Sequence, residues 1–264
     1  MTTFRLVGRP ALNLVVVLVV TLLMWVLLLK LANVSPLVVR QPADVLDYLL
    51  TDPDAAENRA EVFGPLGQTL IDAGIGFVAG LSAAIVLATG MVLSKGIEAA
   101  SMPAVMLVRT VPLVALAPII TLIFGNGFAT VAVMSGIVVL FPALVTIMFG
   151  LRSVSPQMDD LVKVYGGSRW DVLRRVAYPT ALPSIFAAIR ISVPGAITGA
   201  LIAEYFTTTD SVGKAVNTSL ALYRYDQLWS LVVVVTLASV LLYMVAQACE
   251  GFVLARYGPD AGRS

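Results

Sequence analysis

Residues 152–182 read RSVSPQMDDLVKVYGGSRWDVLRRVAYPTAL and join two apolar stretches, residues 129–149 and 183–206. Each apolar stretch is long enough to cross a membrane as a helix, which needs about 20 mainly apolar residues. A turn between neighbouring helices needs only about 2–8 residues, so the polar segment between them must have structure of its own. The sequence therefore predicts two spanning helices joined by a structured loop.

The loop begins with a predicted short helix. Ser155-Pro156 is a typical start, with a hydroxyl at the N-cap and proline at the first helical position. Gly166 and Gly167 are placed to end this helix. Between them, apolar residues recur at helical spacing and form one face: Met158, Leu161, Val162 and Tyr165.

A second short helix is predicted after the glycines. Ser168 can cap it, with Asp171 in the position of a capping box. Pro179 and Pro183 are expected to end it before the next span begins. An amphipathic helix pair of this kind could lie on anionic lipid or could dock a cytoplasmic protein, and periodicity leaves both interpretations open. The rest of its apolar stripe comprises Trp170, Leu173 and Val176 or Ala177.

The whole chain has the composition of an integral membrane protein. Of its 264 residues, 59% are hydrophobic and only 12% are charged, which leaves too little charge to cover a soluble surface. Residues 11–31 are read as an uncleaved first helix, because this apolar run exceeds the 7–15 residues of a cleavable signal. Six spans are predicted: Ala11–Leu29, Leu66–Leu93, Met102–Phe124, Ala129–Phe149, Pro183–Phe206 and Leu228–Ala248.

The uneven distribution of basic residues predicts the orientation of these spans. With the N-terminus in the cytoplasm, 11 of the 17 basic residues fall inside and 5 outside, in agreement with the positive-inside rule. Both termini are then cytoplasmic. Arg109 is expected near the inner end of the third span. Residues 33–65 are expected to form a small helix and loop at the outer surface.

The composition also excludes several kinds of site. The chain has no histidine, and its single cysteine, Cys249, permits neither an internal disulfide nor a thiolate cluster, so no metal site is expected. The net charge of +1 gives no field that favours nucleic acid. No GxxxxGK[ST] motif is present, so the chain is not expected to bind ATP or to be an enzyme.

The polar loop resembles the EAA signature of ABC importer permeases. That signature has an acidic–Ala–Ala triplet, a glycine, and a hydrophobic ending in Leu-Pro. Here the triplet is Asp160-Leu161-Val162, followed at matching spacing by Gly166 and by Val176-Ala177-Tyr178-Pro179. Tyr178 replaces the leucine, so the match depends on spacing and glycine more than on individual letters.

With other stretches included, the resemblance to ABC importer permeases covers residues 66–213. The segment from Gly166 to Pro183 is especially similar to the branch that carries nitrate, sulfonates, taurine and pyrimidine precursors. Further stretches that carry the resemblance are Arg109-Thr110-Val111-Pro112 with Ala117-Pro118, Phe124-Gly125-Asn126-Gly127, Gly150 to Pro156, Ala203 to Phe206, and Ser211-Val212-Gly213.

This resemblance implies an all-α, polytopic type I importer fold with a cytoplasmic pair of coupling helices. One transmembrane permease domain would occupy residues 1–264, with a core at 66–250 and the coupling loop at 152–182. The implied partners are a second permease, identical or paralogous, two cytoplasmic ATPases that bind ATP and Mg²⁺, an extracytoplasmic solute-binding protein, and lipid of the bacterial inner membrane. The residues implied to couple to the ATPase are Asp160, Leu161, Val162, Tyr165, Gly166, Ser168, Arg169, Trp170, Val176 and Pro179.

Gly166 is expected to allow a sharp bend where a Cβ atom would obstruct the chain. Asp160 could pair with a basic group on the ATPase or cap its own helix. In the spans, Glu204 is an ionisable candidate for the solute pathway or a structural partner, and Arg109 is a gate or an anchor. The full set of pathway candidates is Glu204, Pro194, Gly195, Ser192, Thr198, Arg109 and Asn126.

Gly76 and Gly80 have the small-xxx-small spacing of a close helix contact and not that of a nucleotide-binding loop. A secondary transporter or channel is the main rival function, but the spans contain no inverted repeat and no mid-membrane cluster of carboxylates. The solute itself is not specified by the sequence. Sulfonate, taurine, nitrate and pyrimidine-like compounds all stay open.

Overall fold

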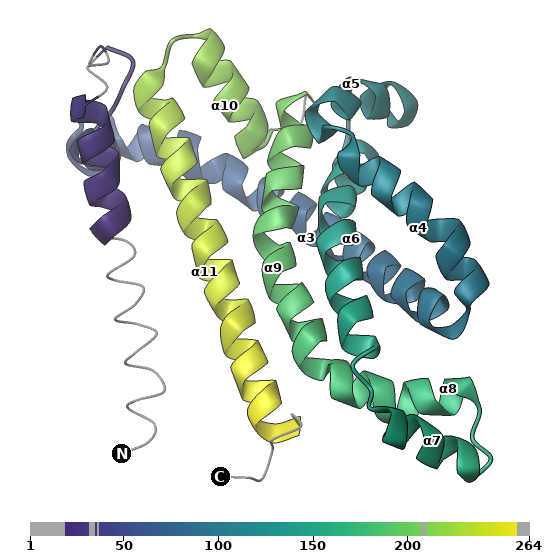
Figure 1. Cartoon of the computed structure of the whole chain (residues 1–264). Coiled ribbons are helices and arrows are strands. Elements are labelled where there is room, and N and C mark those ends of the chain that lie inside the picture. Colours follow the sequence, from purple (N-terminus) through teal and green to yellow (C-terminus); the bar gives the residue numbers. More distant parts are fainter. Residues whose placement is uncertain (1–18, 32–34, 36, 207–209, 258–264) are drawn as a thin grey trace, which may run out of the picture.

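The computed structural model describes residues 19–31, 35, 37–206 and 210–257, and all regular elements in these ranges are helical. The predicted all-α class is therefore confirmed. Beyond an apolar helix at Val19–Leu31, the elements are α2 Pro42–Leu46, η1 Asp47–Thr51, α3 Ala55–Leu93, α4 Lys95–Thr110, α5 Leu113–Phe124, α6 Phe128–Leu151, α7 Pro156–Val164, α8 Arg169–Val172, η2 Leu173–Ala177, α9 Tyr178–Tyr205, α10 Val212–Ala221 and α11 Tyr225–Tyr257 (Figure 1).

Four helical segments of the described chain are long and apolar enough to cross a membrane, and a bent pair makes a possible fifth. The four segments are residues 55–93, 128–151, 169–205 and 225–257. Residues 11–18 of the predicted first span lie outside the described residues, and the remaining part forms the helix Val19–Leu31. The prediction of six spans therefore stays a prediction.

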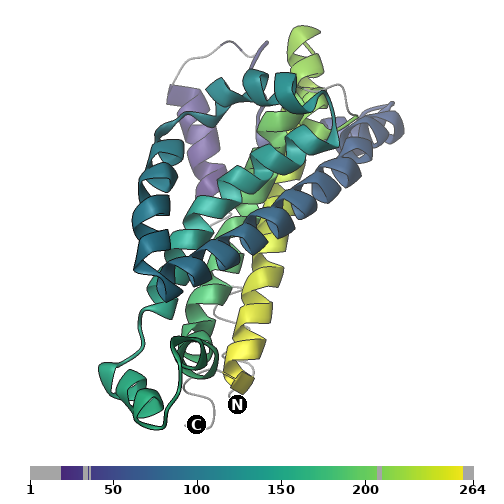
Figure 2. The same cartoon turned by 90° about the vertical axis from the view of Figure 1, so that its right-hand side faces the viewer.

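The predicted span Met102–Phe124 is not a single helix. The structure has two helices there, α4 and α5, which meet at an angle of 105° (Figure 2). The corner is formed by Val111 and Pro112, both with extended backbone, at ψ 125° and 120°. Proline disfavours helical geometry in the residue before it, which explains why α4 ends there.

Helix α6 lies at the centre and packs mainly against α3 and α9. Glycines permit both contacts, because a Cβ atom on Gly80 would lie 2.5 Å from the carbonyl oxygen of Gly136, and one on Gly199 would lie 2.6 Å from the Cα of Ser135. A Cβ on Gly76 would also overlap Ser135. The predicted close-packing role of Gly76 and Gly80 is confirmed.

Pro179 and Pro183 do not end the second loop helix, contrary to the prediction. The chain stays helical from residue 169 to residue 205, and both prolines lie in α9. The wide turn η2 precedes them, and at its end the Tyr178 N–H bonds to the Leu173 carbonyl five residues back. This shifted hydrogen-bond register accommodates the N–H that Pro179 lacks, so α8 continues into the span.

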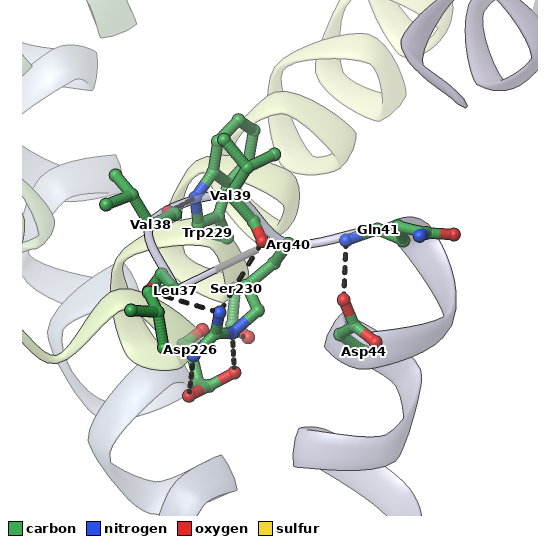
Figure 3. Close-up of polar contacts among 9 residues, drawn as sticks. All are labelled: Leu37, Val38, Val39, Arg40, Gln41, Asp44, Asp226, Trp229 and Ser230. Atoms are coloured by element: carbon green, nitrogen blue, oxygen red, sulfur yellow. Dashed lines mark hydrogen bonds and ion pairs between the residues drawn. The ribbon is translucent and has the colours of Figure 1, made fainter. Parts of the chain in front are cut away.

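At the opposite end of the molecule, the segment before α3 is held against α11. The Arg40 guanidinium forms a bidentate ion pair with Asp226, and the Trp229 indole N–H donates to the Val38 carbonyl at 3.0 Å (Figure 3). Trp229 also stacks on Trp25 with ring centroids 5.5 Å apart. The predicted surface segment is thus α2 and η1, although α3 begins at Ala55, well before the expected Leu66.

Candidate functional site: the coupling hairpin and the membrane groove

We define the coupling hairpin as residues 155–177, which comprise α7, α8 and η2. It projects from one end of the helix bundle, the end at which α11 finishes (Figure 1). Helix α7 begins at Pro156 with Ser155 as its N-cap, as predicted, although the serine side chain makes no capping hydrogen bond. The hairpin is therefore a separate projection that is built from local helix signals.

Gly166 and Gly167 close α7 in a Schellman motif. The Gly166 N–H donates to the Lys163 carbonyl and the Gly167 N–H to the Val162 carbonyl, both at 2.9 Å. Gly166 has a φ of +78°, in the left-handed region that favours glycine. These bonds turn the chain sharply from α7 towards α8.

The sharp bend predicted at Gly166 is present, and apart from its chain neighbours no atom lies within 4 Å of where its Cβ would be. Glycine is required there by backbone conformation and not by space. The position at which a Cβ atom would collide is Gly167, which was predicted to help end α7 but is not among the predicted coupling residues. A Cβ there would lie 2.5 Å from Val162 Cγ1 and 2.8 Å from the Val162 carbonyl oxygen.

The predicted capping box of α8 is confirmed. The Ser168 hydroxyl oxygen accepts a hydrogen bond from the Asp171 N–H at 3.3 Å, and the Ser168 N–H donates to Asp171 Oδ2 at 2.9 Å. The Ser168 hydroxyl also donates to the same carboxylate oxygen at 2.6 Å. These reciprocal bonds fix the start of α8 directly after the glycine turn.

Large apolar side chains cover the free surface of the coupling hairpin. Tyr165 is 84% exposed and Val164 is 83% exposed. In contrast, Val162 is half-buried and Val176 is buried, so these two predicted coupling residues support the hairpin from within. Asp160, Arg169 and Pro179 are exposed. We call the exposed apolar set the coupling face: Met158, Leu161, Val164, Tyr165 and Trp170.

The hairpin is tied to the bundle at the turn between α3 and α4. Arg169 Nη1 donates to the Leu93 carbonyl at 3.4 Å. Just before the hairpin, Arg152 forms a 2.6 Å ion pair with Glu98 at the start of α4. Leu173 is buried in the same region. A displacement of the hairpin would therefore act both on α9, to which it is continuous, and on the α3–α4 turn.

Glu204 lies fully buried where α3, α9 and α10 meet. Its Oε2 atom accepts hydrogen bonds from the Thr69 hydroxyl at 2.8 Å and from the Gly213 N–H at 3.0 Å. The Val212 N–H donates to the Thr69 hydroxyl, so the first turn of α10 is held by this cluster.

Replacing Glu204 by alanine tests whether its role is structural. The change leaves buried donors on Thr69 and Gly213 without an acceptor, and we expect it to destabilise the protein by about 2–4 kcal/mol. Glutamine retains one acceptor oxygen and is expected to cost roughly half as much. Thermal unfolding of the purified protein in detergent measures both. Normal stability of Glu204→Ala combined with lost uptake would instead assign Glu204 to the solute pathway.

A groove of about 480 Å³ lies between the α4–α5 corner and α6. Arg109 lines this groove. The sequence predicted Arg109 near the inner end of the third span, and the structure places it elsewhere along α4. It lies 14 residues along α4 from Lys95, which is about 21 Å from the α3–α4 turn at 1.5 Å per residue, and hence far from the coupling-hairpin end. The other lining residues are apolar apart from one threonine: Val108, Val111, Leu113, Leu116, Ile137, Val138, Phe141, Pro142, Val145, Thr146 and Ile191.

The other predicted pathway residues do not line the groove. Gly195 lies behind the groove, where its Cβ would be 3.4 Å from Val138, and Pro194 precedes it on α9. Ser192 is buried, and its hydroxyl has no hydrogen-bond partner among the described residues. Thr198 is exposed and bonds back to the Pro194 carbonyl at 2.9 Å. Asn126 is in the loop between α5 and α6 and does not line the groove.

Comparison with known proteins identifies the class of this architecture. The family profile of binding-protein-dependent transport system inner membrane components matches residues 62–257. The chain is 28% identical over 72% of its length to the formylaminopyrimidine transport permease protein ThiX of Halalkalibacterium halodurans, of which 77% is covered. It is 26% identical over 88% of its length to the taurine transport system permease protein TauC of Escherichia coli, of which 85% is covered.

The fold is also similar to a solved structure, an amino acid ABC transporter with histidines. The TM-score is 0.56 at 15% identity, and the match covers 75% of this chain and 94% of the other. At that identity the likeness concerns the fold alone.

Proposed function

Because the chain belongs to the family of binding-protein-dependent transport system inner membrane components, we propose that its coupling face docks on a separate ATPase subunit that drives solute import. The protein is the permease subunit of an ABC importer. The observation that carries the docking proposal is a rigid hairpin with an unpartnered apolar surface. Exposed apolar residues gathered in one patch are typical of a protein interaction site.

ATP hydrolysis is assigned to the partner because this chain has no sequence that could cradle nucleotide phosphates. ATP and Mg²⁺ would bind there. The assembly would contain two permeases, identical or paralogous, two ATPases, and a solute-binding protein on the opposite side. The family description supports a location in the bacterial inner membrane, and the distribution of basic residues supports an orientation with both termini on the ATPase side.

The proposed coupling is mechanical. Closure of the ATPases on ATP would displace the coupling hairpin, and α8 would transmit this displacement to α9 without an intervening flexible linker. The hydrogen bond from Arg169 to the Leu93 carbonyl would carry part of the same displacement to the α3–α4 turn. Both helices that flank α6 would then move together, which is the requirement for switching access between the two sides.

Replacing Tyr165 with aspartate tests the docking proposal. A carboxylate at the centre of an apolar contact must be desolvated, so we expect ATP-driven uptake in proteoliposomes to fall roughly tenfold or more. The control is Tyr257→Asp, which makes the same change at an exposed tyrosine at the end of α11, outside the hairpin. Equal uptake by both variants contradicts the docking proposal. Uptake by the permease alone on an ion gradient would instead support a secondary transporter.

The solute is proposed to be a small organic molecule. The two permeases compared above are named for taurine and for formylaminopyrimidine, so similarity alone leaves sulfonate-like and pyrimidine-like compounds both open.

A further inference from the structure

A cleft of about 540 Å³ lies between the coupling hairpin and the ends of α3 and α6. Four basic side chains line it: Lys95, Arg152, Lys163 and Arg169. The lining includes one carboxylate, Asp159, which pairs with Lys163 at 2.6 Å. Lys95 is exposed and forms no ion pair or side-chain hydrogen bond with a described residue. We call this electropositive space the basic cleft.

The neighbouring carboxylates do not cancel the charge of the basic cleft. Glu98 and Asp171 each pair with an arginine, at 2.6 Å and 3.8 Å, and Asp160 is exposed on α7. None of these three carboxylates lines the cleft. Arg169 uses one N–H on a backbone carbonyl, so its other donors and the Lys95 ammonium are available to an anion.

The other residues that line the basic cleft are all apolar. Among them, Val92, Leu93 and Leu151 come from the last turns of α3 and α6. Helix α6 has 24 residues and is about 36 Å long, so its ends lie close to the surfaces of a hydrocarbon core of about 30 Å. Basic pockets between helix ends at the cytoplasmic membrane surface are typical binding sites for anionic lipid headgroups.

The basic cleft and the coupling face occupy opposite sides of α7. Asp159 and Lys163 line the cleft, whereas Leu161 and Tyr165 belong to the coupling face. At about 100° of rotation per residue, these two pairs point about 160° apart. No residue that lines the cleft belongs to the coupling face. Lipid contact and protein docking, which the sequence leaves as alternatives, can therefore both occur on this hairpin.

We propose that the basic cleft binds the phosphate of an anionic phospholipid, held by Lys95 and Arg169. The proposal rests on the membrane orientation and the docking described under the proposed function. Lys95 begins α4 and Arg169 begins α8, so a phosphate bound to both connects the α3–α4 turn to the hairpin through charge-assisted hydrogen bonds. The acyl chains lie against the apolar lining. Anionic lipid thereby strengthens the link between the coupling hairpin and the bundle.

Native mass spectrometry of the purified permease with added lipid tests this proposal. We expect dioleoyl-phosphatidylglycerol to bind at least fivefold more tightly than dioleoyl-phosphatidylcholine, whose choline neutralises the phosphate. Lys95→Gln should weaken binding of phosphatidylglycerol roughly fivefold, and Lys95→Arg should retain it. The matched control is Lys30→Gln, which removes an exposed lysine outside the cleft. Equal binding of the two lipids, or equal effects of Lys95→Gln and Lys30→Gln, would overturn the proposal.

Two further arms of the experiment identify the occupant of the cleft. Inorganic phosphate and glycerol-1-phosphate should not displace phosphatidylglycerol, because neither has acyl chains to contact the apolar lining. Displacement by either would show a site for soluble phosphate and contradict the lipid assignment. Phosphatidylglycerol should also stay bound in the complex with the ATPase, and its loss there would show that the ATPase itself fills the cleft. Binding to the permease alone requires no ATP, so failure of the docking proposal is detected separately by the Tyr165→Asp uptake assay.

Discussion

Replacement of Gly166 by valine is expected to reduce ATP-driven uptake roughly tenfold or more, because valine in the left-handed conformation costs about 1–3 kcal/mol or above. Gly166 has a φ of +78°, and the two hydrogen bonds of the Schellman motif depend on that angle. The strained hairpin would populate other conformations, and the coupling face would lose its fixed shape. Uptake into proteoliposomes that contain the complete transporter measures the effect.

Asparagine at the same position is the matched control. It tolerates the left-handed conformation far better than valine, and no atom within 4 Å would meet its Cβ. We therefore expect Gly166→Asn to keep most of the uptake. Similar uptake by the valine and asparagine variants would contradict the backbone explanation and would restore space at Gly166 as the relevant constraint.

Replacement of Gly80 by leucine is expected to prevent correct packing of α3 on α6. The new Cβ would lie 2.5 Å from the Gly136 carbonyl oxygen and 2.8 Å from Val139 Cβ, and the backbone oxygen cannot move without shifting α6. We expect a loss of about 3 kcal/mol or more, since overpacking alone costs about 1–3 kcal/mol. Thermal unfolding in detergent and the yield of monodisperse protein measure it.

Gly74→Leu provides the comparison on the same helix. Gly74 is two turns from Gly80, and nothing lies within 4 Å of its Cβ position. Both variants add the same apolar side chain to α3, so a difference between them reports the helix contact and not helix propensity or hydrophobicity. Equal stability of the two variants would show that α3 and α6 are not in close contact in the assembled protein.

The parts of the structure that depend on local chemistry could be predicted from the sequence. Ser155-Pro156 starts α7, Gly166 ends it, and the Ser168–Asp171 capping box starts α8. The glycine turn and the capping box satisfy free N–H and C=O groups of the helix ends with neighbouring residues, and Pro156 simply has no N–H to satisfy, so no distant contact is required. The small-xxx-small spacing of Gly76 and Gly80 predicts a close helix contact, although the partner residues on α6 follow only from the fold.

The corner between α4 and α5 could not be predicted with the same certainty. Hydropathy reports only how apolar a stretch is, and it stays high across Val111 and Pro112. Proline is also an ambiguous signal in this chain, because Pro142 and Pro194 both lie inside continuous helices. Neighbouring helices can compensate for a missing hydrogen bond in a membrane, so the sequence alone does not distinguish a tolerated proline from a break.

The surroundings of Glu204 depend on long-range packing. Thr69 is 135 residues away in the chain, and the first turn of α10 reaches Glu204 only because Gly213 has no side chain. The sequence identified the residue as important through the cost of burying an ionisable group. Its partners follow from the meeting of three helices, which no local pattern encodes.

The uninterrupted helix of residues 169–205 also has a mechanical consequence. It is held closely against α6 at two heights: a Cβ on Gly150 would lie 2.4 Å from Ser184 Cβ, and one on Gly199 would lie 2.6 Å from the Cα of Ser135. Ser184 and Gly199 are 15 residues apart, which is about 22 Å at 1.5 Å per residue. A helix clamped at two such points cannot pivot on its neighbour, so a displacement of the hairpin would carry α6 and α9 together towards Glu204 and α10.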